Sequence, residues 1–361
     1  VTIPATGSFT IGSLDIGHGA NGDTTSTAIG TDALDANGSA ASALRNTAVG
    51  QDALGALNNN TADDNVAVGS YAGDGITGGT DNVAVGSYAL SAVAVDDNVA
   101  VGRSALTAFT GSNATAVGSY AADAAGSQTN LTAVGRSALG VATSGNNNTA
   151  VGAFCLDGTV DGAANTALGA SALSADCVSY NTAVGYSALY ANTGSSNTGL
   201  GSSALANFTG SDAVAIGSGA ADVAVGQTNL TAIGTNALGA ATSGNSNTAV
   251  GADSLQTVDG GANTAVGANA LNADCVDYNA ALGYNALKVF TGSNATAVGS
   301  GAADVATSAA NLTAVGLNAL GVCVDGASNT AVGVAALQTV DGTQNAVSYT
   351  HLRAHETVLD L

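Results

Sequence analysis

The residues that could do chemistry in this chain are few, and most of them are aspartates and tyrosines. The 361 residues hold 26 acidic side chains against 5 Lys and Arg, a formal net charge of −21. Adjacent carboxylates at Asp63–Asp64 and Asp96–Asp97 could bind Ca²⁺, but neither an EF-hand loop nor a Ca²⁺-binding nonapeptide surrounds them. We therefore interpret them as acids of solvated turns, and we predict no metal site.

The groups that serve as nucleophiles or general bases are equally sparse. Cys155, Cys177, Cys275 and Cys323 form no Cys-x-x-Cys pair, so we expect small buried side chains rather than metal ligands. His18 is the only histidine before residue 347, and we expect it on the surface. An active site needs convergent polar groups. The sequence therefore predicts no catalytic residues and no cofactor.

Five tyrosines share a place in the sequence, because each follows a glycine by one or two positions. They are candidate contacts for a glycan or a protein, although they could equally cap a sheet face: Tyr71, Tyr88, Tyr120, Tyr186 and Tyr284. The acidic balance repels nucleic acid and anionic membranes. No run of large apolar residues is long enough for a membrane helix. We expect neither partner for this segment.

The element that positions these residues is a short repeat, Asn-Thr-Ala-Val-Gly-x-x-Ala-Leu. Its glycines run from Gly30 to Gly333, and from Gly69 onward successive glycines are 16 or 17 residues apart. This spacing predicts an all-β parallel solenoid, or β-roll, of about 19 coils. The glycines that we take as marking the repeat are Gly50, Gly69, Gly86, Gly102, Gly118, Gly135, Gly152, Gly169, Gly185 and Gly201.

Each column of the repeat has a physical interpretation. Thr-Ala-Val predicts a short strand, Gly a bend, and x-x-Ala-Leu a second short strand. Stacked Asn residues, such as Asn46 and Asn148, are expected to bridge coils through their amides. If Val and Leu point inward, both Ala columns point outward and form a strip that would pack against another chain. We therefore predict a homotrimer. The opposite parity, with Ala inside and Val outside, would also leave an apolar face for an oligomer to cover.

The two ends of the chain depart from the repeat. We assign residues 1–20 to an N-terminal fragment or cap and residues 21–346 to the β-roll. The string Val-Ser-Tyr-Thr-His-Leu-Arg-Ala-His-Glu-Thr begins at Val347 in mid-coil and resembles the translation of a sequencing-library adapter. Residues 347–361 are accordingly interpreted as a non-native tail. Because the chain starts at Val1 and contains no Met, we expect a fragment of a longer reading frame.

The motif resembles the head repeats of YadA-like trimeric autotransporter adhesins at Asp81–Ala89 and Ser211–Ala221. Asn181–Gly201 resembles related repeats of phage tail fibres. The resemblance extends from about Thr27 to Val347 and implies a left-handed, trimeric β-roll on a bacterial surface or virion. The coil here is two or three residues longer than in those heads, and no stalk or anchor is present in this sequence.

These observations favour an extracellular, structural and adhesive rod that binds a host surface protein or glycan. Three alternatives stay open. An ice-binding solenoid would use the Thr column as a ladder, although Val66, Val83, Val99 and Val214 interrupt it. A Ca²⁺-binding β-roll would use the turn acids. A carbohydrate-active β-helix enzyme would need larger coils and clustered acids or bases.

Overall fold

The chain is an all-β parallel solenoid in the computed structural model. The structure describes residues 8–11, 14–18, 24–35, 43–58, 61–141, 144–158, 161–175, 178–323, 326–339 and 342–348. Two units, Val1–Gly210 and Ser211–Leu361, are described in turn. Within the described part of the chain no helix has the length and apolar character needed to cross a membrane.

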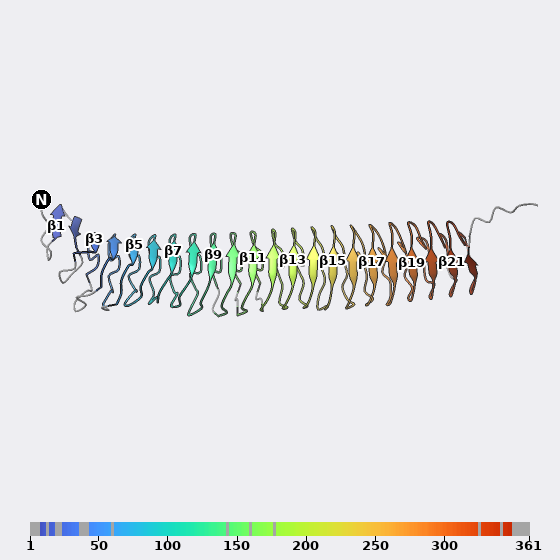
Figure 1. Ribbon diagram of the computed structural model, residues 1–361, viewed down its shortest axis with the longest axis horizontal. Helices are drawn as coiled ribbons and strands as arrows, with labels where there is room; N and C mark the ends of the chain where they lie inside the picture. The colour runs from blue at the N-terminus through green and yellow to red at the C-terminus, as the bar shows by residue number, and fades with distance from the viewer. Residues whose placement is uncertain are drawn as a thin grey trace, which may run out of the picture. The chain divides into compact units, whose positions relative to one another are not determined.

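The first unit begins with an antiparallel hairpin and continues as a parallel ladder (Figure 1). In the ladder each three-residue strand pairs in register with the next, so that Thr149, Ala150 and Val151 oppose Thr166, Ala167 and Leu168. The strands are β1 (Ser8–Ile11), β2 (Leu14–Gly17), β3 (Thr27–Ile29), β4 (Thr47–Val49), β5 (Val66–Val68), β6 (Val83–Val85), β7 (Val99–Val101), β8 (Thr115–Val117), β9 (Thr132–Val134), β10 (Thr149–Val151), β11 (Thr166–Leu168), β12 (Thr182–Val184) and β13 (Thr198–Leu200).

The second unit is built from the same coil and has the same register. Thr231, Ala232 and Ile233 oppose Thr248, Ala249 and Val250, for example. Its strands are β14 (Val214–Ile216), β15 (Thr231–Ile233), β16 (Thr248–Val250), β17 (Thr264–Val266), β18 (Ala280–Leu282), β19 (Thr296–Val298), β20 (Thr313–Val315), β21 (Thr330–Val332) and β22 (Ala346–Ser348). β22 pairs with β21, so Val347 and Ser348 extend the ladder past the predicted end of the β-roll at residue 346.

The parity of the strands is the opposite of our leading prediction. The central residue of β3–β21 is buried, and it is Ala in all of them except β13, as at Ala133 and Ala150, whereas the flanking Thr and Val face outward. The Ala three residues after each glycine is buried as well, as at Ala105 and Ala172. The predicted outward Ala strip is therefore wrong. The core is thin because both Ala columns share it with the Leu column.

The second predicted strand is also absent from the described coils, and the backbone explains why. Residues two and four positions after the glycine have positive φ, as at Ser104 (56°) and Leu106 (53°), so x-x-Ala-Leu is a turn. Two left-handed residues in four abolish the alternation of a strand, and Ala and Leu both point inward. Hydrogen bonds between coils hold the turn, since the N–H of Leu106 donates to the carbonyl of Ala121 at 2.9 Å.

The repeated glycine has two separate reasons to be glycine. At Gly86 φ is +132°, a conformation that side chains disfavour. A Cβ built at Gly86 would also lie 2.6 Å from the carbonyl carbon of Gly102 in the next coil. The glycines thus allow the bends of neighbouring coils to approach closely, and the predicted structural role of this column is consistent with that geometry.

The Asn column forms the ladder that the sequence predicts. Asn46 Oδ1 accepts hydrogen bonds from the backbone N–H of Asn65 at 2.9 Å and from its Nδ2 at 3.1 Å. The same contacts recur between Asn65 and Asn82. The buried amides thereby satisfy turn backbone that would otherwise lack partners. The ladder breaks where Ala114 takes the place of Asn, and Phe109 is buried in the core of the preceding turn.

Candidate interaction surfaces

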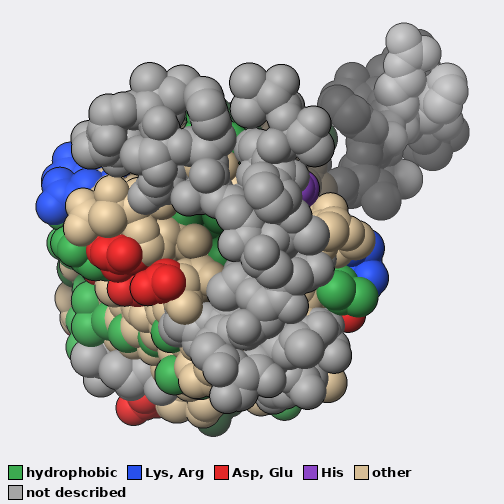
Figure 2. Space-filling model, turned by 90° about the vertical axis from the view of Figure 1, so that its left-hand side faces the viewer, with side chains coloured by type: hydrophobic (Ala, Val, Ile, Leu, Met, Phe, Trp, Pro, Cys, Tyr) green, Lys and Arg blue, Asp and Glu red, His purple; other side chains and the backbone are tan. Residues whose placement is uncertain are grey.

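The outer face of the sheet carries two parallel columns, one of Thr and one of Val, Ile or Leu. We call the second column the outer apolar column. In the first unit Val117 is 38% exposed and Leu168 is 48% exposed; in the second unit Leu282 is 50% exposed. Figure 2 shows hydrophobic side chains beside acidic ones on the visible surface. Monomeric soluble proteins rarely expose a long contiguous apolar patch, so this column is a candidate contact surface.

A second surface lies at the bend that follows each strand. Its side chains are those one or two positions after the column glycine, and we call this position the edge. Tyr71, Tyr88 and Tyr120 all lie at the edge of the first unit with φ close to +60°. The rings of Tyr71 and Tyr88 stack with centroids 5.0 Å apart and planes 5° from parallel. The predicted tyrosines of this unit are thus brought together by the stacking of coils.

The edge of the first unit also holds two arginines that the sequence did not single out. The guanidinium of Arg103 lies over the Tyr120 ring, 5.1 Å from its centroid, and that of Arg136 lies over Phe154 at 4.9 Å. Each Arg follows one column glycine by one residue and each ring follows the next glycine by two. Aligning the repeats on their glycines would have revealed this pairing, whereas the linear sequence separates the partners by 17 or 18 residues.

The remaining predicted tyrosines, one in each unit, are exposed. Tyr186 is 64% exposed and Tyr284 is 57% exposed. Sequence reasoning missed Tyr180 and Tyr278, which are exposed to a similar degree and occupy positive-φ turn positions just before the Asn column. The sequence could have indicated these two tyrosines, because the residue just before the Asn column lies at a turn in each coil. Of the five predicted contacts, Tyr71 and Tyr88 are the two whose rings touch each other among the described residues.

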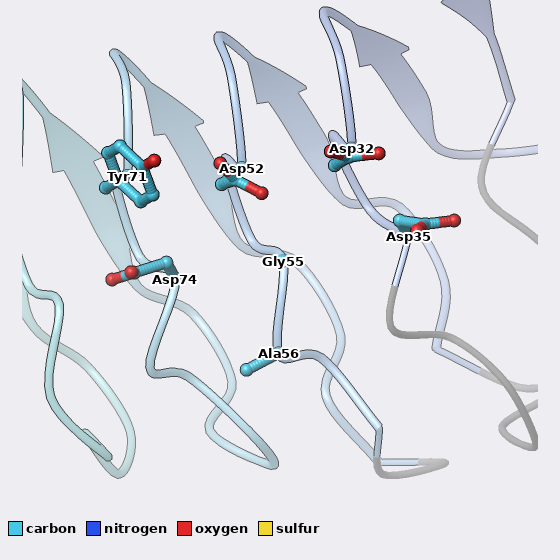
Figure 3. Close-up of a pocket in the computed structure, with 7 residues that line it drawn as sticks. All are labelled: Asp32, Asp35, Asp52, Gly55, Ala56, Tyr71 and Asp74. Atoms are coloured by element: carbon cyan, nitrogen blue, oxygen red, sulfur yellow. The ribbon is translucent and has the colours of Figure 1, made fainter.

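An acidic cleft of about 450 Å³ lies near the start of the first unit (Figure 3). Asp32, Asp52 and Tyr71 occupy the same edge position in successive coils. The carboxylate of Asp52 raises the pKa of Tyr71, because a nearby negative charge disfavours the phenolate. The other lining residues are Asp35, Gly55, Ala56 and Asp74.

A column of aspartates follows the Leu column, and partial burial raises the pKa of each. In the first unit Asp123 and Asp157 lie on either side of Gly140, and Asp123 adds to the raised pKa of Asp157. The corresponding residues elsewhere are Asp74, Asp222 and Asp304. No group of three or more His, Cys, Asp or Glu among the described residues is placed to hold a metal ion.

The predicted turn acids make contacts between coils. Asp64 pairs with Arg45, which lowers the pKa of that carboxyl group, and Asp63 Oδ1 accepts a hydrogen bond from the N–H of Leu44. Asp96 accepts a hydrogen bond from the N–H of Thr80 at 2.8 Å. Asp63 and Asp96 thus cap turn backbone in neighbouring coils, while Asp64 forms an ion pair.

The cysteines and the histidine offer no reactive arrangement in the described residues. Cys155, Cys275 and Cys323 are buried and free. Burial raises the pKa of Cys155 to about 11 and that of Cys275 to about 12, so both stay protonated thiols near neutral pH. Cys177 lies outside the described residues. His18 is exposed, and its Nδ1 lies 3.2 Å from the carbonyl oxygen of Ser26.

Comparison with protein-family models and with curated protein sequences finds no match to this chain.

Proposed function

We propose that this chain is a non-catalytic, structural and adhesive segment of a fibre on a bacterial cell surface or a phage virion. It binds a host or matrix surface and assembles as a homotrimer. The observation that supports this most is the outer apolar column, whose Val, Ile and Leu side chains stay partly exposed from coil to coil. The resemblance of the repeat to trimeric adhesin heads and tail fibres supports the same function.

The outer apolar column supplies the driving force for assembly. Stacked strands repeat about every 4.8 Å, so equivalent side chains form straight rows that a second copy can match. Burying exposed apolar surface contributes about 25 cal/mol per Å². Few polar groups lie beside these apolar rows, because the neighbouring Thr column contributes only one hydroxyl group per coil.

The test is the solution mass of the full chain by light scattering after size exclusion. We expect three times the 34.0 kDa of one chain. Val117→Lys/Val134→Lys is expected to shift the mass to a monomer while the circular dichroism is kept, since both side chains face outward. Thr115→Lys/Thr132→Lys on the same strands is the matched control and should stay assembled. A monomeric wild-type chain at tens of micromolar would overturn the assembly proposal.

The second candidate, an ice-binding solenoid, is favoured by one observation. Thr115, Thr132, Thr149, Thr166, Thr182 and Thr198 oppose one another in consecutive strands and point outward. A regular row of hydroxyl and methyl groups can order water at fixed intervals. An ice-recrystallisation assay tests this function, with Thr149→Lys/Thr166→Lys as the disrupted variant. Crystals that coarsen at the same rate with and without the wild-type chain would exclude it.

A further inference from the structure

The edge of the first unit carries a row of planar groups that extends over consecutive coils. From the coil of Gly69 to that of Gly152, each coil places one aromatic ring or one guanidinium at this edge. The members are Tyr71, Tyr88, Arg103, Tyr120, Arg136 and Phe154. We call this the edge row. Three of its neighbouring pairs are in contact: the Tyr71 and Tyr88 rings stack, the Arg103 guanidinium lies over the Tyr120 ring, and the Arg136 guanidinium lies over the Phe154 ring.

The guanidinium groups of Arg103 and Arg136 each lie over an aromatic ring. A guanidinium that lies on a ring uses its face for the contact and keeps its in-plane N–H groups for another partner. Arg103 and Arg136 are both exposed. Such fixed, planar donors are suited to binding a carboxylate through two hydrogen bonds.

In a chain with a net charge of −21, Arg103 and Arg136 lack an ion pair among the described residues. Arg45 pairs with Asp63 and Asp64. Neither Arg103 nor Arg136 forms an ion pair with any described residue. The raised pKa values of Asp123 and Asp157 have burial as their main cause, and neither arginine contributes to them. The part of the edge row from Arg103 to Arg136 therefore carries two positive charges that no ion pair with a described residue neutralises, whereas Tyr71 at its start lines the acidic cleft.

The spacing of the arginines restricts the partner. Gly102 and Gly135 are two coils apart, so the two guanidinium groups repeat at about 10 Å along the stack. Nucleic acid carries a phosphate about every 3.4 Å per strand, and the net charge of −21 would repel such a dense row of anions. A polymer with sparse, regular carboxylates meets less repulsion, because salt screens charges beyond about 8 Å at physiological ionic strength.

We propose that the edge row binds a linear acidic glycan in which every second sugar carries a carboxylate. Arg103 and Arg136 bind two successive carboxylates of the polymer. The phenol groups of Tyr71, Tyr88 and Tyr120 hydrogen-bond to sugar hydroxyls, and the rings beneath the arginines position the guanidinium groups. This assignment rests on the proposed adhesive function and names the class of surface that it contacts.

The experiment titrates the full chain with a hyaluronan octasaccharide, which alternates a uronic acid with a neutral sugar, by calorimetry at 0.15 M salt. We expect measurable binding that Arg103→Gln/Arg136→Gln weakens at least tenfold. Arg45→Gln/Lys288→Gln makes the same change of charge away from the edge row and should stay within twofold of wild type. Arg103→Lys/Arg136→Lys keeps the charge but loses the planar donors, so we expect an intermediate loss. Tyr120→Ala is expected to weaken binding by less than the double Gln variant.

Several outcomes would overturn the site. They are no binding by the wild-type chain, equal binding by Arg103→Gln/Arg136→Gln, equal binding of a neutral chitin oligosaccharide, or tighter binding of a Glu-rich peptide of similar length. The solution mass separates this result from the fibre proposal. A trimer that ignores the glycan removes only the edge-row assignment, whereas a monomer that binds it removes only the fibre assembly.

Discussion

The two units share a coil but differ at the edge. In the second unit the residues two positions after the column glycine are four Asn, two Gly, one Asp and one Ala: Gly219, Asn236, Asp253, Asn269, Asn285, Gly301, Asn318 and Ala335. All have φ between 53° and 64°. Asn, Asp and Gly are the residues that adopt this conformation most readily. In the second unit the residue type at this position, Ala335 excepted, thus suits the backbone conformation.

The first unit departs from that rule. Tyr71, Tyr88, Tyr120 and Phe154 have the same positive φ, although their bulky side chains disfavour it. A residue type that its backbone conformation disfavours is common at functional sites, where the function and not the local conformation determines which residue is present. The comparison teaches that the inward columns are set by the fold in both units, while the edge is the part of the coil where function can differ.

The largest expected effect tests whether the column glycine has the same role in each unit. Gly86→Ala in the first unit and Gly267→Ala in the second would each force a Cβ against the backbone of the next coil, at φ of +132° and +135°. Each should destabilise its unit by about 3 kcal/mol in urea unfolding followed by circular dichroism. Gly226→Ala is the control, because φ is +75° but nothing lies within 4 Å. It should cost about 1 kcal/mol. A harmless Gly267→Ala would show that the units are built differently.

The next effect concerns the Asn ladder. Asn82→Ala removes an acceptor for the backbone N–H and the Nδ2 of Asn98, both at 3.0 Å, and should cost about 2 kcal/mol. Asn263 in the second unit accepts from the N–H of Asn279, but its own Nδ2 has no partner among the described residues. Asn263→Ala should therefore cost less. Urea midpoints of the two variants decide this, and an equal or larger loss for Asn263→Ala would contradict the reasoning.

A smaller effect on stability is expected at the edge, and it should differ between the two units. Tyr88→Ala removes the stack on Tyr71, and we expect a loss of about 1 kcal/mol of stability in thermal or urea unfolding. Tyr284→Ala in the second unit removes an exposed ring without a ring contact in the described residues and should stay within about 0.5 kcal/mol. Equal effects would mean that the stack does not stabilise the first unit.

The smallest effect depends on pH. The pKa of Asp157 is raised by burial and by Asp123, so the folded chain holds that proton more tightly than the unfolded chain. Stability from this group is fully present below its unfolded value of 3.8 and is lost as the pH rises through the folded pKa. Asp157→Asn should therefore stabilise the chain at pH 7, by about 0.5 kcal/mol or less.

Two variants provide controls for this pH effect. Asp222→Asn in the second unit should have a smaller effect, because burial alone raises that pKa. Asp64→Asn should have the opposite sign, because Arg45 lowers the pKa of Asp64 and the ion pair is lost. Thermal midpoints measured from pH 4.5 to 7 distinguish the three. A rise in the midpoint with pH for wild type, unchanged in Asp157→Asn, would contradict the assignment.

Much of the fold could be predicted from local patterns. The interval between glycines predicted the parallel solenoid, and the Asn column predicted the amide ladder seen between Asn46 and Asn65. The turn at x-x-Ala-Leu, where a second strand was predicted, could not be predicted in the same way, because φ of 53° at a Leu such as Leu106 is a rare conformation for that residue. Burial of the side chain offsets that cost only once the coils have stacked.

The candidate surfaces were likewise predictable from the sequence only in part. The positions of Tyr71, Tyr88 and Tyr120 relative to their glycines are a property of the sequence, as are the coil length, the Gly and Asn columns and the net charge. The tertiary structure decided that Val rather than Ala faces outward, and that Arg103 and Arg136 lie on aromatic rings. The physical reason is that both depend on how a left-handed turn directs its side chains and on which residues stack above one another. Neither is encoded by periodicity within a single coil.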